Sequence, residues 1–259
     1  QNDQLAVFVR LGSDYKSNYY EYEIPLALTP PGKYNTYLEY DRYIVWPESN
    51  FLNLELQKLV NLKKERNAAK RMADSSVGYG TLYTGRDPEN EQNRMAVIGN
   101  PSLSDIRVIL IGVRNNSSTT KDGTVWLNEL KVTDFDNSGG WAAKANATLS
   151  MSDIVTLNFG THIETAGFGG VDQSLNDRRL DDYERYNFAV QADLGRFLPE
   201  KAKLKAPIYY SMTKEKTSPK YNPLDQDVLL KDALDETTTK QEKDSISNYA
   251  VERSTVQNF

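Results

Sequence analysis

The chain has no cysteine among its 259 residues and a single histidine, His162. The missing thiols exclude disulfides, thiolate nucleophiles and cysteine-ligated zinc sites together. A catalytic triad or a zinc site would need His162, which is followed two positions later by Glu164. We expect His162 to lie on the polar face of a strand. The sequence therefore predicts a protein that is not an enzyme and has no catalytic residue, cofactor or metal ion.

Basic charge and long apolar runs are also scarce. Lys and Arg number 31 against 36 Asp and Glu, for a formal charge of −5. A pI near 5.2 argues against a nucleic-acid partner, because phosphate binding needs a clustered basic face. There is no apolar run of about 18 residues that would predict a transmembrane helix. The chain has no Met start or signal peptide and begins within a predicted strand, so we expect an internal segment of a longer protein.

Residues 1–138 are predicted to form a galactose-binding-like jelly-roll sandwich with a helical insertion. In "NYYEYEIPLAL", Tyr20 and Tyr22 alternate with Glu21 and Glu23, which predicts one solvent-exposed face for that strand. "DGTVWLNELKVTDF" starts with a glycine and carries alternating bulky residues around a central polar pair, as the last strand of such jelly rolls commonly does. The predicted strands are 5–11, 19–28, 94–98, 105–113 and 124–135.

The helical insertion is predicted at about residues 50–72. Ser49 or Asn50 can cap it, and an apolar stripe through Leu56 and Leu59 follows at helical spacing. We expect the stripe to dock onto the sandwich, with a partner-binding helix as the alternative. "KKERNAAKR", at its end, is interpreted as a solvated face.

Aromatic residues suggest a second function class, because the chain has sixteen tyrosines. An aromatic platform would suit a soluble carbohydrate-binding surface module of two β-domains. We favour the simpler interpretation, in which these rings fill a sheet surface and its covering loop. The candidates are Tyr19, Tyr20, Tyr22, Tyr34, Tyr37, Tyr40 and Tyr43.

Residues 139–259 show four segments of apolar and polar alternation: 141–151, 155–163, 183–196 and 204–213. Each approaches or exceeds the length of a tilted transmembrane β-strand, about nine to eleven residues, so antiparallel strands of a large transmembrane β-barrel are predicted. The alternative is a soluble sheet with one solvated face. The predicted lipid-facing residues are Trp141, Leu149, Val155, Leu157, Phe159, Phe188, Val190, Leu194, Ile208 and Tyr210; the predicted lumen-facing residues are Lys144, Asn146, Asn158, His162, Arg185, Gln191 and Asp193.

The lengths of the connections suggest an orientation. The apolar set stays at odd positions across residues 152–154, which predicts a three-residue turn or one long strand there. Short connections at 152–154 and 197–205 alternate with long loops at 167–182 and 214–247. Since bacterial barrels have short periplasmic turns and long outer loops, the long loops and the sandwich are predicted on the extracellular side of the outer membrane.

Two segments match known binding loops in part. "DFDNSGG" begins like a calcium loop with Asp134 and Asp136, but its twelfth position is Ala145 and not the bidentate Glu of an EF-hand. A turn is favoured, with a nonstandard calcium site as the alternative. "GYGTLYTG" lacks the Lys-Ser/Thr of a phosphate loop and is interpreted as an ordinary loop.

Taken together, several motifs resemble the SprA/Sov family, the giant outer-membrane translocon of the type IX secretion system in Bacteroidota. They are "NYYEYEIPL", "VWPESNFLNLELQKLVNLKKERN", "DGTVWLNELKVTDFDNSGGWAAKANATLSMSDIVTLNFG" and "AGFGGVDQSLNDRR", between about Leu5 and Asn222. The resemblance implies a very large barrel that exports folded cargo proteins with C-terminal sorting domains and is linked to gliding motility. It also implies an accessory outer-membrane barrel protein and a periplasmic plug protein as partners.

Overall fold

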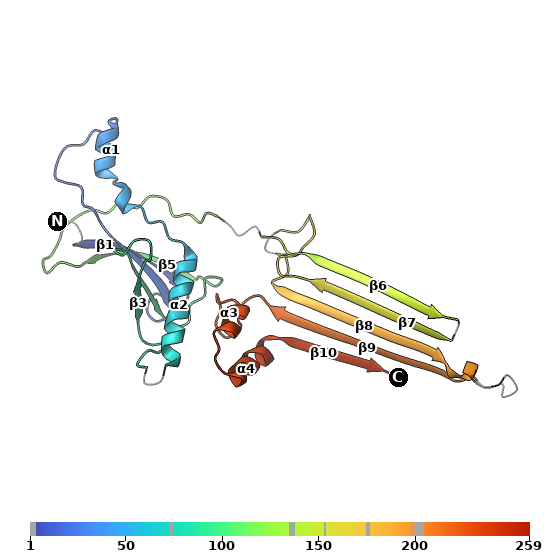
Figure 1. Ribbon diagram of the computed structural model, residues 1–259. Helices are drawn as coiled ribbons and strands as arrows, with labels where there is room; N and C mark the ends of the chain where they lie inside the picture. The colour runs from blue at the N-terminus through green and yellow to red at the C-terminus, as the bar shows by residue number, and fades with distance from the viewer. Residues whose placement is uncertain are drawn as a thin grey trace. The chain divides into compact units, whose positions relative to one another are not determined.

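The computed structural model describes residues 4–72, 75–134, 138–152, 154–174, 177–197, 199 and 205–259. The chain is mainly β, with two five-stranded antiparallel sheets and several helices (Figure 1). It divides into two compact units. The first comprises Gln1–Glu129 with Asp225–Val228, and the second comprises Leu130–Leu224 with Leu229–Phe259.

The sheet of the first unit has the strand order β3-β4-β2-β1-β5. Four of the five strands predicted for this region are confirmed, within a few residues at their ends. The additional strand, β3, overlaps the end of the segment interpreted as a loop, so that interpretation is wrong for residues 83–85 and holds for residues 78–82. The bounds are β1 (Leu5–Gly12), β2 (Tyr19–Pro25), β3 (Tyr83–Arg86), β4 (Arg94–Ile98) and β5 (Val108–Asn115).

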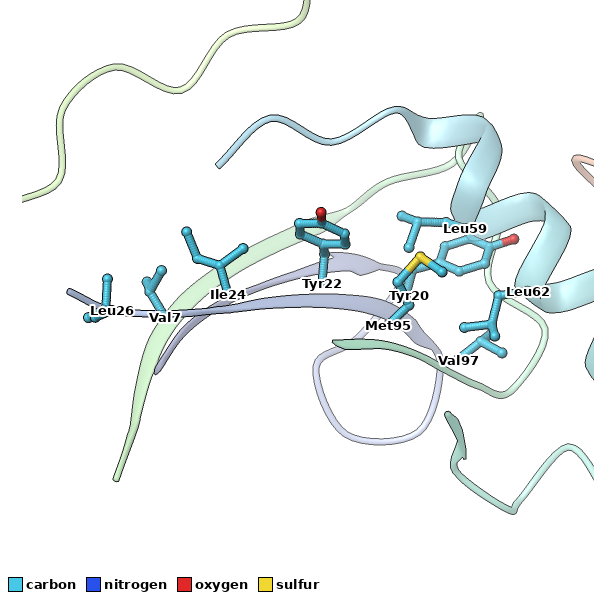
Figure 2. Close-up of a cluster of buried hydrophobic side chains, with 9 residues drawn as sticks. All are labelled: Val7, Tyr20, Tyr22, Ile24, Leu26, Leu59, Leu62, Met95 and Val97. Atoms are coloured by element: carbon cyan, nitrogen blue, oxygen red, sulfur yellow. The ribbon is translucent and has the colours of Figure 1, made fainter. Parts of the chain in front are cut away.

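One face of this sheet carries the hydrophobic core. Register places Val9 opposite Tyr22, and Tyr22 opposite Met95, so apolar side chains of β1, β2 and β4 share that face. The helix α2 (Leu56–Arg71) covers it through Leu59 and Leu62, which confirms the predicted docking. Figure 2 shows the cluster, made of Val7, Tyr20, Tyr22, Ile24, Leu26, Leu59, Leu62, Met95 and Val97.

The helical insertion differs in detail from the prediction. It also contains α1 (Glu39–Val45) and the 3₁₀ turn η1 (Glu48–Asn50), and α2 begins six residues later than the predicted insertion, which started at residue 50. Asn50 does not cap α2. Its side chain instead accepts a hydrogen bond from Ala27 N at 2.8 Å and donates one to Ala27 O at 2.9 Å, and so fastens the loop to the end of β2.

The jelly-roll topology is not confirmed, because the described part of the first unit contains one sheet. Residues 124–134 form no strand, and the strand predicted there is wrong; Phe135 and the following two residues lie outside the described part. The physical reason is that a strand with apolar side chains on both faces needs cover from two sides. No second sheet of this unit supplies that cover among the described residues.

The second unit contains a meander in the order β10-β9-β8-β7-β6, with β6 and β10 as open edges and no closed barrel among the described residues. The three-residue connection predicted at 152–154 is confirmed, although Asp153 lies outside the described residues. The bounds are β6 (Ala142–Met151), β7 (Val155–Glu164), β8 (Asp181–Asp193), β9 (Pro207–Pro219) and β10 (Glu252–Asn258).

Short helices complete the second unit. The 3₁₀ helix η3 (Leu194–Phe197) follows β8, and α3 (Leu230–Asp235) and α4 (Lys240–Ala250) lie between β9 and β10. Thr239 caps α4, because its side chain accepts a hydrogen bond from Glu242 N at 3.3 Å. Of the helices described, none has both the length and the apolar character needed to cross a membrane.

Candidate functional site

Four strands of the second sheet share an apolar face, which is built by their register. Leu149 pairs with Leu157 and Leu157 with Val190, which in turn pairs with Tyr210, so the row crosses four strands. Side chains alternate along each strand, and β6, β7, β8 and β9 add their apolar sets to the same side. In β10 the register places Gln257 on that side, opposite Met212, and Val256 on the other. The structure thus brings together these predicted residues: Leu149, Val155, Leu157, Phe159, Phe188, Val190, Ile208 and Tyr210.

Two of the predicted apolar-face residues lie beyond the strands. Trp141 comes immediately before β6, and Leu194 begins η3, so strand alternation does not fix the face of either. Trp141 is still tied to the sheet end, since its N–H donates to Thr165 Oγ1 at 2.8 Å and its carbonyl accepts from Thr165 N at 2.9 Å.

Aromatic rings form a row across the apolar face. The centroids of Phe159 and Phe188 are 5.0 Å apart, those of Phe188 and Tyr210 are 6.5 Å apart, and those of Tyr210 and Phe259 are 5.3 Å apart. Phe159 remains 48% exposed, so no described element covers the row. A broad concavity of about 580 Å³ beside it includes Ala145 and Ala147. The face can bury apolar material.

The opposite face is polar. Thr148 donates to Asn158 Oδ1 at 2.8 Å, and Arg185 Nε lies 3.4 Å from Glu215 Oε1. The predicted polar residues on the strands share this side: Lys144, Asn146, Asn158, His162, Arg185, Gln191 and Asp193.

His162 lies within this polar surface. Its Nε2 is 3.0 Å from Glu164 Oε1, and its ring meets the edge of the Tyr183 ring with centroids 5.9 Å apart. Among the residues described, no group of three or more His, Asp or Glu side chains could hold a metal ion. Asp136, one of the two candidate residues of the alternative calcium site, lies outside the described residues.

Comparison with known protein families shows which family the chain belongs to. The model of the SprA_N family, described as motility related/secretion protein, matches residues 1–234. The chain belongs to the SprA family. No curated protein matches it. As a member of the SprA family it is a protein related to motility and secretion, which associates it with the cell envelope.

The first unit of this SprA-family chain contains a buried ionic cluster around α2. Lys63 is fully buried, and its Nζ lies 2.8 Å from Asp225 Oδ1 and donates to Pro101 O at 3.0 Å. Asp227 accepts from Tyr20 OH and from Leu103 N, both at 2.9 Å. Burial, followed by the charge of Asp227, raises the pKa of Tyr20 well above its ordinary value. These aspartates fasten the segment Asp225–Val228 to the first unit.

Sequence reasoning missed this cluster in the SprA-family chain. "KKERNAAKR" was interpreted as a solvated face, yet Lys63, Arg66 and Asn67 are buried, and that interpretation is wrong. Burial lowers the pKa of Arg66, whose Nη1 donates to Gly99 O at 2.6 Å. The sequence did contain one signal for this pairing. The helix carries basic residues, and "LDQDV", residues 224–228, carries two aspartates. Pairing across about 160 residues is set by the fold and not by local pattern.

A second ionic cluster lies on the sheet face opposite α2. Glu21 is 2% exposed and lies 2.7 Å from Arg10, 2.9 Å from Arg94 and 3.1 Å from Arg114. The alternation predicted for β2 is confirmed, but its polar face is not exposed to solvent at Glu21. Burial alone would raise the pKa of Glu21; hydrogen bonds and charges from Arg10 and Arg114 outweigh it and lower the pKa. A cavity of about 630 Å³ adjoins the cluster beside Arg94.

Proposed function

We propose that the second sheet contributes strands to an outer-membrane protein-export channel, the type IX secretion translocon, that passes folded cargo to the cell surface without catalysis. The observation that carries this proposal is the uncovered apolar face, opposite a polar face, across neighbouring antiparallel strands. A transmembrane barrel has this arrangement, with lipid on one side and an aqueous lumen on the other. Membership of a motility- and secretion-related family supports the same function.

The proposal includes partners and an orientation. The partners are cargo proteins with C-terminal sorting domains, an accessory outer-membrane barrel protein, a periplasmic plug protein and outer-membrane lipid, with a link to gliding motility. They follow from the resemblance to the translocon family. The jelly-roll identity of the first unit and its extracellular position belong to the same proposal, as does the absence of nucleic acid as a partner.

A pair of neighbouring substitutions in β7 tests the lipid-facing assignment. Leu157→Arg places a guanidinium on the apolar face, and Asn158→Arg places the same group on the polar face. The first is expected to cost about 2–4 kcal/mol near a bilayer midplane, and the second little. Refolding into lipid vesicles, followed by heat-modifiable migration across a denaturant series, measures both. Equal tolerance of the two changes would remove the assignment.

Protease treatment of intact cells tests the orientation. Cleavage is expected within residues 167–182 or 214–247, and protection is expected at 197–205. Cleavage confined to 197–205 would invert the proposed orientation. Fractionation of cells, with cargo release measured after deletion of the gene, then tests the transport role itself.

Carbohydrate binding by a soluble module is the second candidate, and one observation favours it. Tyr20 and Tyr22 are buried in the core, but Tyr37, Tyr40 and Tyr43 at α1 are 92%, 75% and 63% exposed. Exposed rings with spare faces can stack on sugars. Glycan-array binding that disappears in Tyr40→Ala and Tyr43→Ala variants would favour this function, whereas partition of the chain into detergent would count against it.

A further inference from the structure

Residues 124–129 have the composition of a strand but form none in the described structure. The segment reads "TVWLNE", with two β-branched residues and a tryptophan. It carries no regular structure, and Val125, Trp126 and Leu127 are 41%, 70% and 62% exposed. Glu129, at its end, has a φ of 52°, a left-handed conformation that is uncommon for a residue with a side chain. The segment therefore exposes apolar surface that a paired strand would bury.

The strand that precedes this segment, β5, has an open edge. β5 pairs with β1 on one side and is the last strand of its sheet, so its other edge is open among the described residues. Ile109 and Val113 of β5 are 51% and 47% exposed. An open edge presents unpaired N–H and C=O groups and accepts a further strand.

The connection between β5 and the segment begins with a change of direction. Asn115, the last residue of β5, accepts a hydrogen bond from Ser117 N at 3.0 Å and donates one to Thr119 O at 2.8 Å. Such side-chain bonds to the following backbone start turns. Residues 116–123 then provide eight residues of connection, enough to bring residue 124 back beside residue 115.

Side-chain parity selects the register. In β5, Ile111 and Val113 lie on the α2 side of the sheet, and Ile111 packs against the core. Pairing Asn115 with Thr124 places Trp126 opposite Val113, on that apolar side. A shift by one residue would move Trp126 to the face that holds the arginines.

The same register also suits the other face of the sheet. It places Leu127 opposite Gly112, which has no side chain and lies against the Phe8 ring, with an added Cβ only 2.4 Å from Phe8 Cζ. Leu127 would then cover Phe8 beside the glycine. Trp126 and Leu127, the two most exposed apolar residues of the segment, both gain cover in this arrangement.

We propose that residues 124–129 add to the open edge of β5 within the same chain, as a sixth antiparallel strand in the register that pairs Asn115 with Thr124. The edge of β5 is thus a strand-accepting site, and its occupant is the segment that follows it. In the paired state Glu129 takes an extended backbone conformation in place of its positive φ. This inference is independent of the proposed channel function.

Engineered disulfides test the register, and the absence of native cysteines makes the result unambiguous. Ile111→Cys with Asn128→Cys places two thiols directly opposite each other in the proposed pairing, at a separation a disulfide can span. Ile111→Cys with Leu127→Cys is the matched control, because it places the thiols on opposite faces. Mild oxidation of the chain at high dilution, followed by peptide mass spectrometry, measures intramolecular cross-linking.

We expect at least about tenfold more intramolecular disulfide in the first pair than in the control. Equal yields, or a predominance of cross-linked dimers from exchange between two copies, would overturn the proposal. Amide hydrogen exchange of the unsubstituted chain provides a readout without mutation. Slowed exchange from Val125 to Asn128 supports the pairing, and exchange at the rate of an unstructured peptide contradicts it.

Discussion

At the scale of single residues, Asp227 is the acceptor on which the buried cluster of the first unit depends. It accepts from Tyr20 OH, Leu103 N and Ser102 Oγ, and it lies 3.9 Å from Lys63. Asp227→Ala is expected to cost about 3–5 kcal/mol, because it leaves buried donors and part of the Lys63 charge without compensation. Hydrogen exchange in β2 measures this local loss.

Two variants make the Asp227 prediction specific. Asp227→Asn keeps a hydrogen-bond acceptor, and asparagine tolerates the positive φ of 76° at this position. This variant should therefore lose less stability than Asp227→Ala. Asp105→Ala removes an exposed partner of Arg107 and should leave the melting temperature unchanged. Equal losses for Asp227→Ala and Asp105→Ala would contradict a structural role for the cluster.

Glu21 gives the first unit a pH dependence with a definite sign. Its pKa in the folded state lies below the ordinary 4.5, so its contribution is complete above that value and is lost as the pH falls through the lower folded pKa. Glu21→Gln should reduce stability at pH 7 by about 1.5–3 kcal/mol and flatten the acid dependence. Hydrogen exchange in β2 between pH 7 and acid conditions measures both effects. Asp122→Asn, on an exposed loop, should change neither.

Sequence could predict the faces of residues but not the burial of charges. Period-two alternation correctly separated Leu157 from Asn158, because side chains of a strand must alternate. Lys63 and Glu21 look like surface residues in any local window. Their burial depends on partners that arrive from other strands or from a loop more than 150 residues away.

At the scale of elements, the packing of α2 on the first sheet rests on leucines that reach β3. Leu62 is 2% exposed, and its Cδ1 would lie 2.6 Å from a Cβ added at Gly85. Leu62→Ala is expected to cost about 2–5 kcal/mol, because a cavity opens under the helix. Gln57→Ala, on the exposed side of the same helix, should cost less than about 0.5 kcal/mol. Helix-resolved hydrogen exchange separates the two outcomes, and equal costs would refute the docking.

Elements with strong periodicity were predictable, and those set by context were not. β7 and β8 were found because apolar and polar residues alternate along most of their length. α1 was missed, because "EYDRYIV" is rich in tyrosine and β-branched residues that favour strands. β3 was missed since four residues with a central glycine give too short a pattern, although β4 pairs with all of them.

At the scale of the whole molecule, the first unit is discontinuous in sequence. It includes Asp225–Val228, and the carboxylates of that segment pair with buried groups of α2. A fragment of residues 1–129 should therefore unfold at a lower temperature than the same unit in the full chain. Lys63→Met should reduce this difference in melting temperature. In the fragment the buried Lys63 charge lacks the aspartates of Asp225–Val228, and the substitution removes that charge. An equal melting temperature for fragment and full chain would show that the segment is dispensable.

The open edges of the second sheet have a consequence for handling the protein. β6 has ten exposed residues and no partner on its outer side among those described, and β10 is equally uncovered. Two free edges joined to an uncovered apolar face favour growth of the sheet from copy to copy in water. The chain produced by itself should therefore scatter light and accumulate in inclusion bodies. Detergent should suppress this assembly by covering the face, while the two edges stay available to neighbouring strands of the native protein.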